Sequence, residues 1–320
     1  MGNVPVFRFS PGLDMLTGIH ILLTYKCNLE CDHCFLFSSP RAEGTFTLPQ
    51  IRHVLAEAKA IGTVDWIYFE GGEPLLFYPS MLEGIRIARS IGFQVGVVTN
   101  AYGAVSEEDA LLWLRPLAEL GVADLSISDD SFHYGEGDES PAKRALAAAR
   151  QLGIPTSTIC IQKPLLQAKP GSSRQKGKPI AGGSAMFRGR AVEKLTAGLP
   201  RRPWHELTQC PYEDLRSPSR VHVDQYGHVH LCQGLSMGNM WQHPLSTLVR
   251  EYRADSHPVC APLAKGGPAS LARQYNVEHE PEYVDECHFC YLVRRALVDR
   301  FPGYLAPKEV YGMADTPGLT

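Results

Sequence analysis

The sequence predicts an α/β fold built from repeated strand–helix units. Short apolar runs rich in β-branched and aromatic residues recur between residues 19 and 161, and longer amphipathic stretches separate them. Strand–helix–strand repeats make right-handed crossovers, so consecutive strands are expected to lie parallel in a sheet or a barrel. After residue 200 the composition changes to many Pro and His residues and short strand-like pieces, which predicts a domain boundary there.

The apolar runs are expected to form buried parallel strands, because they are short and nearly continuous in hydrophobic residues. They cover residues 19–24, 65–70, 94–99, 123–128 and 156–161.

The stretches between these runs are expected to be helices. Each ends at a glycine, the residue that most readily adopts the left-handed conformation after a helix. Three of them begin at a side chain that favours the N-cap position. The helices are predicted at 47–62, 79–92, 106–121 and 140–153, with Thr47, Ser106 and Ser140 as N-caps.

Composition and charge exclude several classes of protein. The 320 residues are 44% hydrophobic and carry a formal net charge of -3, so neither nucleic acid nor an anionic membrane is an expected partner. No signal peptide or membrane-spanning run is present, which predicts a cytoplasmic location. The nine cysteines are then expected to be reduced and to serve metal or redox chemistry.

Three of the cysteines follow the first predicted strand at C-x3-C-x2-C spacing: Cys27, Cys31 and Cys34. Functional loops of parallel α/β folds follow the carboxyl ends of strands, so this motif lies where chemistry is expected. Three thiolates would hold a [4Fe–4S] cluster and leave one iron open for another ligand. A zinc site completed by His33 or by a distant ligand is the alternative.

A second motif follows the next strand, where Gly71, Gly72, Glu73 and Pro74 form the sequence GGEP. Glycines allow backbone to approach a small ligand closely, and Glu73 would add a negative charge for an ammonium group. With the cysteine motif one strand earlier, this region resembles the radical S-adenosylmethionine (SAM) superfamily.

The resemblance implies a partial (β/α)6 TIM-like barrel over about residues 19–200, with one [4Fe–4S] cluster. The open iron would take the amino and carboxylate groups of SAM. One electron from a flavodoxin- or ferredoxin-type reductant would cleave SAM to methionine and a 5′-deoxyadenosyl radical, the chemistry being that of the cofactor.

The resemblance also assigns contacts to SAM. His33 would meet the adenine, Asn100 would line the site, and Ser128 and Asp130 would contact the ribose or the carboxylate. Arg190, or Arg188, would pair with the SAM carboxylate. Each residue also has an alternative role without SAM. His33 could be a solvated loop residue and Asn100 an ordinary turn residue. Ser128 and Asp130 could cap a helix, and Arg188 or Arg190 could form a surface salt bridge. A glycine-rich motif of the fifth strand is not evident, so adenine contacts there are not assigned.

The C-terminal third carries a second group of cysteines. A hairpin is predicted around Tyr226 and Gly227, and four cysteines lie near it or on a terminal helix: Cys210, Cys232, Cys287 and Cys290. This layout resembles the SPASM domain or its shortened Twitch form, which implies domains at 1–200 and 201–320 and one auxiliary [4Fe–4S] cluster. A zinc site with four thiolates is the alternative.

Two cysteines remain. Cys160, at the end of the fifth strand, is expected to be a small buried apolar residue. Cys260 lies in an expected polar loop, where it could replace one auxiliary ligand. It could also donate a hydrogen atom to a substrate radical, as cysteines do in radical SAM peptide epimerases.

The resemblance implies an enzyme that abstracts a hydrogen atom from a residue of a peptide or protein. About eighteen residues precede the first strand, too few for a separate peptide-recognition domain. A small-molecule dehydrogenase acting on a sugar or aminocyclitol is therefore the alternative. A non-catalytic metal-binding scaffold would be favoured by a broken cysteine triad or a lost GGEP, and neither is seen.

Overall fold

The structure, a computed structural model, describes residues 16–135, 137, 139–165 and 184–313. Five parallel strands form one side of its eight-stranded main sheet, and each lies within a range that the sequence predicts, except that β1 begins one residue earlier. They are β1 (Gly18–Leu22), β2 (Trp66–Glu70), β3 (Gln94–Thr99), β4 (Asp124–Ser128) and β5 (Thr156–Ile159). Each pairs in parallel with the next, from Gly18 opposite Trp66 to Ser128 opposite Ile159. The predicted parallel α/β sheet is confirmed.

Four helices connect these strands, as predicted: α1 (Leu48–Ile61), α2 (Tyr78–Ile91), α3 (Glu107–Glu119) and α4 (Pro141–Gln151). Thr47, Ser106 and Ser140 each accept a hydrogen bond from a backbone N–H of the first helical turn, which confirms them as N-caps. Helices α1 and α2 end at Gly62 and Gly92 in the left-handed conformation.

The main sheet continues on the other side of β1, which the sequence did not predict. β7 (Arg220–Asp224) pairs in parallel with β1, and β8 (His228–Cys232) and β9 (Leu235–Asn239) follow antiparallel. The order is β5-β4-β3-β2-β1-β7-β8-β9, with β5 and β9 at the edges. Among the described residues the parallel strands run from β1 to β5 on one side, and the next parallel strand along the chain, β7, pairs with β1 on the other.

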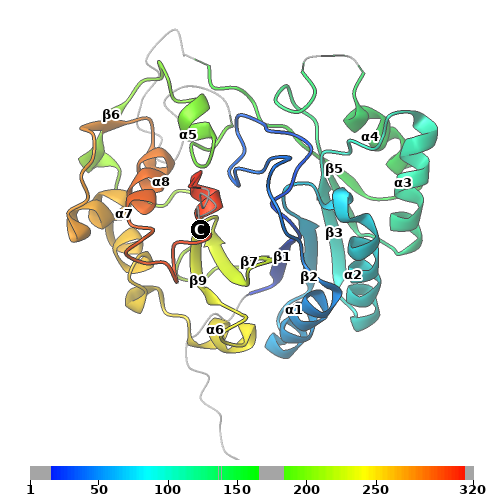
Figure 1. Cartoon of the computed structure of the whole chain (residues 1–320), viewed down its shortest axis with the longest axis horizontal. Helices are drawn as coiled ribbons and strands as arrows, with labels where there is room; N and C mark the ends of the chain where they lie inside the picture. The colour runs from blue at the N-terminus through cyan, green and yellow to red at the C-terminus, as the bar shows by residue number, and fades with distance from the viewer. Residues whose placement is uncertain (1–15, 136, 138, 166–183, 314–320) are drawn as a thin grey trace, which may run out of the picture.

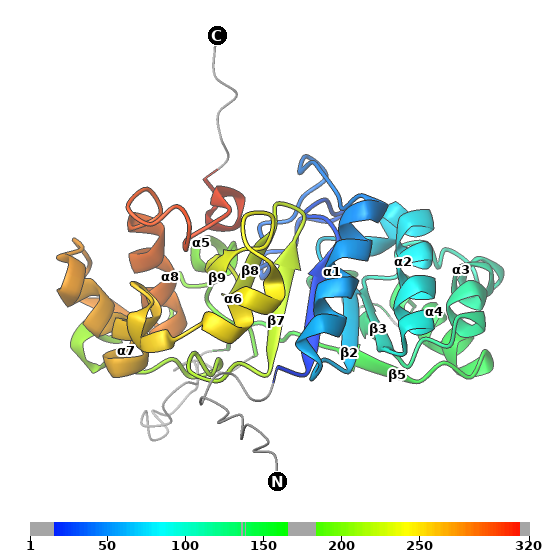
Figure 2. The ribbon, with the colours of Figure 1, turned by 90° about the horizontal axis from the view of Figure 1, so that it is seen from below.

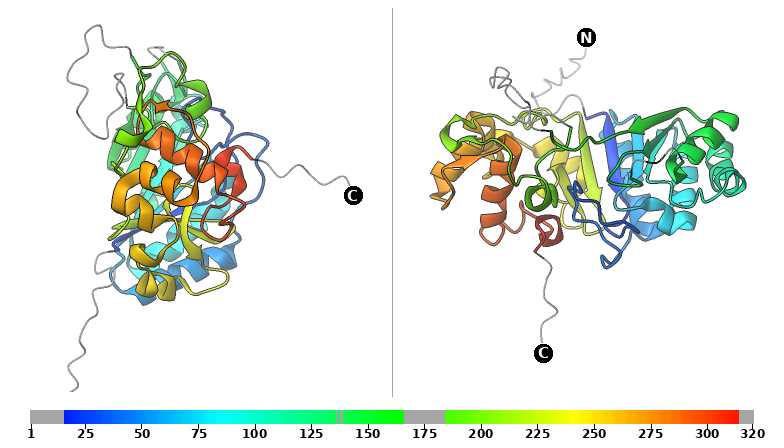
Figure 3. Two further views of the ribbon diagram at one scale, coloured as in Figure 1. Left: turned by 90° about the vertical axis from the view of Figure 1, so that its left-hand side faces the viewer. Right: turned by 90° about the horizontal axis from the view of Figure 1, so that it is seen from above.

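The remaining elements lie in the C-terminal half, apart from the 3-10 turn that follows β2. They are α5 (Ala191–Lys194), α6 (Leu245–Glu251), α7 (Cys260–Tyr275), α8 (Glu286–Ala296), a two-stranded sheet of β6 (Arg202–Pro203) and β10 (Glu282–Tyr283), and the 3-10 turns Pro74–Phe77, Trp204–Glu206, Ala254–Ser256 and Lys308–Tyr311. Helices α1–α4 cover the β1–β5 half, and α5–α8 lie toward the opposite end of the molecule's long axis (Figure 1). Figures 2 and 3 show the same division from other sides.

One continuous hydrophobic core runs through both halves, and its buried residues include Ile21, Val97, Val223, Leu271 and Phe289. The domain boundary near residue 200 stays a prediction, since β7 joins the C-terminal residues to the same sheet.

Within the described residues, no helix combines the length and the apolar character needed to cross a membrane.

Candidate functional site

A cavity of about 480 Å³ lies where β1–β5 end. The loops that follow the strands supply most of its wall, which is the usual place for a ligand in a parallel α/β fold. Most of the predicted site residues lie on it. The lining includes Cys27, Cys31, His33, Cys34, Gly71, Gly72, Thr99, Asn100, Ser128, His133 and Arg188.

The cysteine triad is held on one wall of this cavity by a turn in which Cys34 N–H donates to the carbonyl of Cys31 at 3.1 Å. Burial raises the pKa of both Cys27 and Cys31 to about 12, so these thiols stay protonated unless a cation approaches them. A metal centre would supply that charge, because thiolates are the form that binds metal.

The glycines of GGEP bring two loops of the chain together. Gly72 N–H donates to the Thr24 carbonyl at 2.7 Å. A Cβ atom on Gly71 would lie 2.4 Å from that carbonyl oxygen, and one on Gly72 would lie 2.1 Å from the oxygen of Lys26. Only glycine permits this approach, which places the GGEP loop directly against the segment that leads into Cys27.

Glu73 lies behind the cavity wall and not on it, because its side chain is fully buried and is absent from the lining. Its carboxylate accepts hydrogen bonds from Leu75 N–H at 3.0 Å, Thr99 Oγ1 at 2.7 Å and Asn100 N–H at 2.8 Å. Pro74 follows it as the first residue of the 3-10 turn. This placement supports a role for Glu73 in joining the ends of β2 and β3.

Asn100 is the contact between the third strand and the cysteine loop. Its Nδ2 donates to Asn28 Oδ1 at 2.9 Å and lies 3.7 Å from the sulfur of Cys27. Since Glu73 holds the Asn100 backbone, the two motifs that the sequence singled out act on the same part of the cavity wall.

His33, Asp130 and His133 form a cluster beside the cavity. Asp130 accepts hydrogen bonds from His133 Nδ1 at 2.8 Å and from the backbone N–H of Ile161 at 3.1 Å. The carboxylate itself does not line the cavity, whereas both imidazoles do. Burial, followed by the neighbouring His133, lowers the pKa of His33 to about 4, so His33 is a neutral ring at physiological pH.

The two arginines of the FRGR segment have different positions. Arg190 holds the cysteine loop: Nη1 donates to the Cys31 carbonyl at 2.8 Å and Nη2 to the Ser38 carbonyl at 2.7 Å. It does not line the cavity, so this placement gives no support to a contact with the SAM carboxylate. Arg188 does line it.

A second, smaller cavity brings together the four cysteines of the C-terminal third. Its wall contains Cys210, Cys232, Cys287 and Cys290, together with Arg188 and Arg294. Helix α8 presents Cys287 and Cys290 one turn apart, and Asp285 caps that helix by accepting from His288 N–H. Burial raises the pKa of Cys210 to about 12 and also raises those of Cys287 and Cys290.

Two buried cations face these thiols. Arg188 is 7% and Arg294 is 2% exposed, and the Nε atoms of both lack a hydrogen-bond partner among the described residues. Arg188 donates to the sulfur of Cys232 at 3.0 Å. Buried cations require compensating negative charge. Arg188 has one carboxylate partner, Glu213 at 3.4 Å, whereas Arg294 forms no ion pair with a carboxylate among the described residues. A centre ligated by anionic thiolates would provide it.

The spacing of the sulfurs bears on which metal the two cysteine groups fit. Within the part of the chain that the structure describes, the groups of three ligand atoms within 4.8 Å of one another contain no cysteine. The thiolates of a zinc site lie roughly 3.8 Å apart, given a Zn–S bond of about 2.3 Å and tetrahedral geometry. Among the described residues, no three cysteine sulfurs are therefore gathered as closely as the thiolates of a zinc site.

The surroundings of Cys260 and Cys160 differ from those that the sequence predicts. Cys260 begins helix α7 instead of lying in a polar loop, and it is fully buried and lines neither cavity. This position gives no support to a hydrogen-atom donor or an auxiliary ligand. Cys160 is exposed and not buried, because it lies just beyond β5 at the edge of the sheet.

Sequence reasoning missed three polar residues of the cavity floor, His20, Tyr68 and Glu70. They lie within strands that read as apolar. The sequence does contain a sign of them, because polar side chains stand at alternate positions of an otherwise apolar strand. Alternate residues of a strand face the same side of the sheet, which here is the side of the cavity.

An open parallel sheet with a three-cysteine loop and a GGEP loop around one cavity defines the class of SAM-binding iron–sulfur domains. Residues 21–164 match the family model of the radical SAM superfamily. Its members use a [4Fe–4S] cluster and SAM.

Two curated relatives are similar to less than half of this chain. YydG of Bacillus subtilis (strain 168), named as a peptide biosynthesis protein, is 29% identical over 133 residues, which is 42% of each protein. The PqqA peptide cyclase of Streptomyces rochei is 32% identical over 145 residues, covering 44% of this chain and 35% of that protein. The chain thus spans less than half the length of these curated relatives.

Among solved structures, BtrN in complex with AdoMet and 2-DOIA is similar with a TM-score of 0.49 and 14% identity. The similarity covers 78% of this chain and 92% of that one.

Proposed function

We propose that the protein is a radical SAM enzyme that abstracts a hydrogen atom from a residue of a peptide or protein. The observation that carries this proposal is the meeting of the cysteine triad, the GGEP loop and Asn100 around one cavity at the strand ends. When bound, a [4Fe–4S] cluster with SAM supplies a 5′-deoxyadenosyl radical after one-electron reduction.

The chain's own residues would hold and shield these groups. Cys27, Cys31 and Cys34 would ligate the cluster, and Asn100 would donate toward the sulfur of Cys27. Gly71 and Gly72 would leave room for SAM beside the triad, and Ser128 would offer a hydroxyl from the fourth strand. His33, kept neutral by burial, would offer its ring to the adenine. Glu73, Asp130 and Arg190 would position these groups from behind the wall.

The C-terminal cysteines would ligate one auxiliary [4Fe–4S] cluster. Four thiolates leave no iron open, so the role would be electron transfer or support. A cluster over zinc is supported by the buried cations Arg188 and Arg294 and by the absence, among the described residues, of three cysteine sulfurs within 4.8 Å of one another. Catalysis would also require an external reductant of the flavodoxin or ferredoxin type. Reduced thiols favour a reducing compartment such as the cytoplasm.

A peptide substrate is supported by the names of two relatives, which refer to peptide biosynthesis and peptide cyclisation.

The test of SAM chemistry is the formation of 5′-deoxyadenosine by anaerobically reconstituted protein given SAM and dithionite. Wild type is expected to form it, and Cys31→Ala is not. Cys160→Ala is the matched control, because it removes an exposed cysteine that lines neither cavity, and it should match wild type. Equal product from Cys31→Ala would refute the assignment of the triad, and no product from wild type would favour a metal-binding scaffold.

The substrate class can be tested by deuterium transfer. A digest of perdeuterated bacterial protein should yield 5′-deoxyadenosine one mass unit heavier if a peptide C–H bond is attacked. Transfer only from a mixture of perdeuterated sugars and aminocyclitols would favour the small-molecule alternative.

A further inference from the structure

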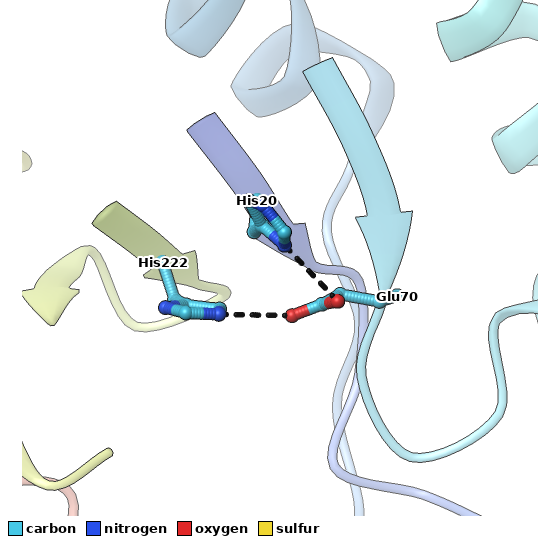
Figure 4. A group of neighbouring side chains, drawn as sticks. All are labelled: His20, Glu70 and His222. Carbon is cyan, nitrogen blue, oxygen red and sulfur yellow. Dashed lines mark ion pairs between the residues drawn. The ribbon is translucent and has the colours of Figure 1, made fainter. Parts of the chain in front are cut away.

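Two histidines and a glutamate meet beside the cavity at the strand ends, and two of them, His20 and Glu70, line it. His20 comes from β1, Glu70 from the end of β2 and His222 from β7, and their side chains point toward one another (Figure 4). One ligand atom from each lies within 4.8 Å of the other two. The group depends on the pairing of β7 with β1, which places His222 directly opposite His20 in the sheet.

The separations suit ligands of one ion. His20 Nδ1 lies 3.1 Å from Glu70 Oε2, and His222 Nε2 lies 3.2 Å from Glu70 Oε1. Nitrogen and oxygen ligands about 2.0–2.1 Å from a tetrahedral zinc ion lie roughly 3.3 Å apart. Yet His20 Nδ1 has no hydrogen-bond partner despite its short distance from the carboxylate. Because His20 Nδ1 and Glu70 Oε2 are close but not aligned as donor and acceptor, both can direct a lone pair toward a metal ion between them.

The Glu70 carboxylate is also short of partners. Among the described residues, no backbone N–H or hydroxyl donates a recorded hydrogen bond to it, and the two imidazoles are its ion-pair partners. The other His–carboxylate groups differ. Asp224 accepts from Tyr25 Oη at 2.9 Å and from the backbone N–H of His228 at 2.9 Å, and Asp130 accepts from Ile161 N–H. Those carboxylates are saturated by the chain itself, whereas Glu70 has lone pairs to offer.

The group is mostly buried, and part of it reaches the cavity. The side chains of His20, Glu70 and His222 are 18%, 15% and 10% exposed. His20 and Glu70 line the cavity together with Tyr68, whose ring stacks on His20 at 4.6 Å between centroids.

We propose that His20, Glu70 and His222 form a binding site for a divalent transition-metal ion, Zn²⁺ or Fe²⁺, with its open coordination positions toward the cavity. Two imidazoles and one carboxylate form the ligand set of many catalytic zinc sites and of non-haem iron sites. The open positions would bind an oxygen or nitrogen of a molecule in the cavity. This inference does not rest on the proposed SAM chemistry, because it uses none of the cysteines.

The test is zinc binding by anaerobic protein with its iron–sulfur sites loaded, titrated with Zn²⁺ against a chromophoric chelator. Wild type is expected to bind one zinc per chain in addition to any at the cysteines. Glu70→Gln and His222→Gln should each weaken this zinc by about 10-fold or more. His243→Gln is the matched control, because His243 is exposed and outside the group, and it should equal wild type.

X-ray absorption at the zinc edge separates this site from the cysteine sites. Two imidazoles in a nitrogen and oxygen shell are expected, and a sulfur shell near 2.3 Å would instead mean binding at thiols. The proposal is overturned if wild type binds no such zinc, or if Glu70→Gln and His222→Gln, shown folded by circular dichroism, bind it as tightly as wild type.

Discussion

Arg188 Nη1 lies 3.0 Å from the sulfur of Cys232, and the same arginine lines both cavities. Its guanidinium also stacks over Phe35, next to Cys34, at 5.3 Å from the ring centroid. One buried cation thus connects the cysteine triad with the four C-terminal cysteines.

Replacing Arg188 with Gln should lower the reduction potential of the auxiliary cluster. A cation that donates to a ligating sulfur stabilises the more negative reduced state, and hydrogen bonds to sulfur are among the factors that set cluster potentials. A hydrogen bond to a charged group contributes roughly 1.5–3 kcal/mol, and only the part of it that differs between the two redox states changes the potential. The expected shift is therefore on the order of tens of millivolts. A redox titration followed by electron paramagnetic resonance measures it. Arg216→Gln, which removes an exposed guanidinium paired with Asp255, should leave the potential unchanged.

Replacing Arg190 with Ala should loosen the cysteine triad. The change leaves the carbonyls of Cys31 and Ser38 without their charged donor, at a cost of about 1.5–3 kcal/mol for each hydrogen bond. Iron at the triad should then be lost faster to a chelator. Arg41→Ala is the control, because Arg41 is exposed and its ion pair with Glu30 on the same loop contributes little. Equal rates of iron loss in the two variants would contradict this role.

Replacing Gly72 with Ala should destabilise the fold by about 1–3 kcal/mol or more, because the added Cβ would lie 2.1 Å from the Lys26 oxygen. Urea unfolding measures the change. Gly303→Ala serves as control, since no atom lies within 4 Å of its added Cβ. A Gly72→Ala protein as stable as the Gly303→Ala protein would show that the two loops are not in this close contact.

Glu73 should make stability depend on pH. Burial, opposed by its hydrogen bonds, raises its pKa from 4.5 to about 7. Between these values the folded chain holds a proton that the unfolded chain releases, so the free energy of unfolding should fall as pH rises. The slope is at most about 1.4 kcal/mol per pH unit for one proton. Urea unfolding of cluster-free protein between pH 5 and 7 should show a shallower slope for Glu73→Gln than for the exposed control Glu278→Gln. Equal slopes would mean that Glu73 does not titrate in this range.

The sequence predicted the strands, helices and caps of the first half because each was encoded locally. Thr47, Ser106 and Ser140 cap helices through hydrogen bonds to residues three positions away. It could not predict that β7 would join β1, since that pairing depends on contacts between residues about 200 positions apart. The His20–Glu70–His222 group was missed for the same reason.

The site was predicted to a similar extent. The positions of the cysteines and of GGEP followed from spacing and strand order. The direction of each side chain could not be predicted in this way. Asn100 and Arg188 line the cavity, whereas Glu73 and Arg190 lie behind its wall and hold residues that line it.

The most direct test of two iron–sulfur sites is the count of iron, sulfide and zinc per chain in protein purified and reconstituted without oxygen. About eight irons and eight sulfides are expected for wild type, and about four of each for both Cys31→Ala and Cys287→Ala. About four irons with one zinc that Cys287→Ala removes would assign the C-terminal cysteines to zinc and contradict the auxiliary cluster.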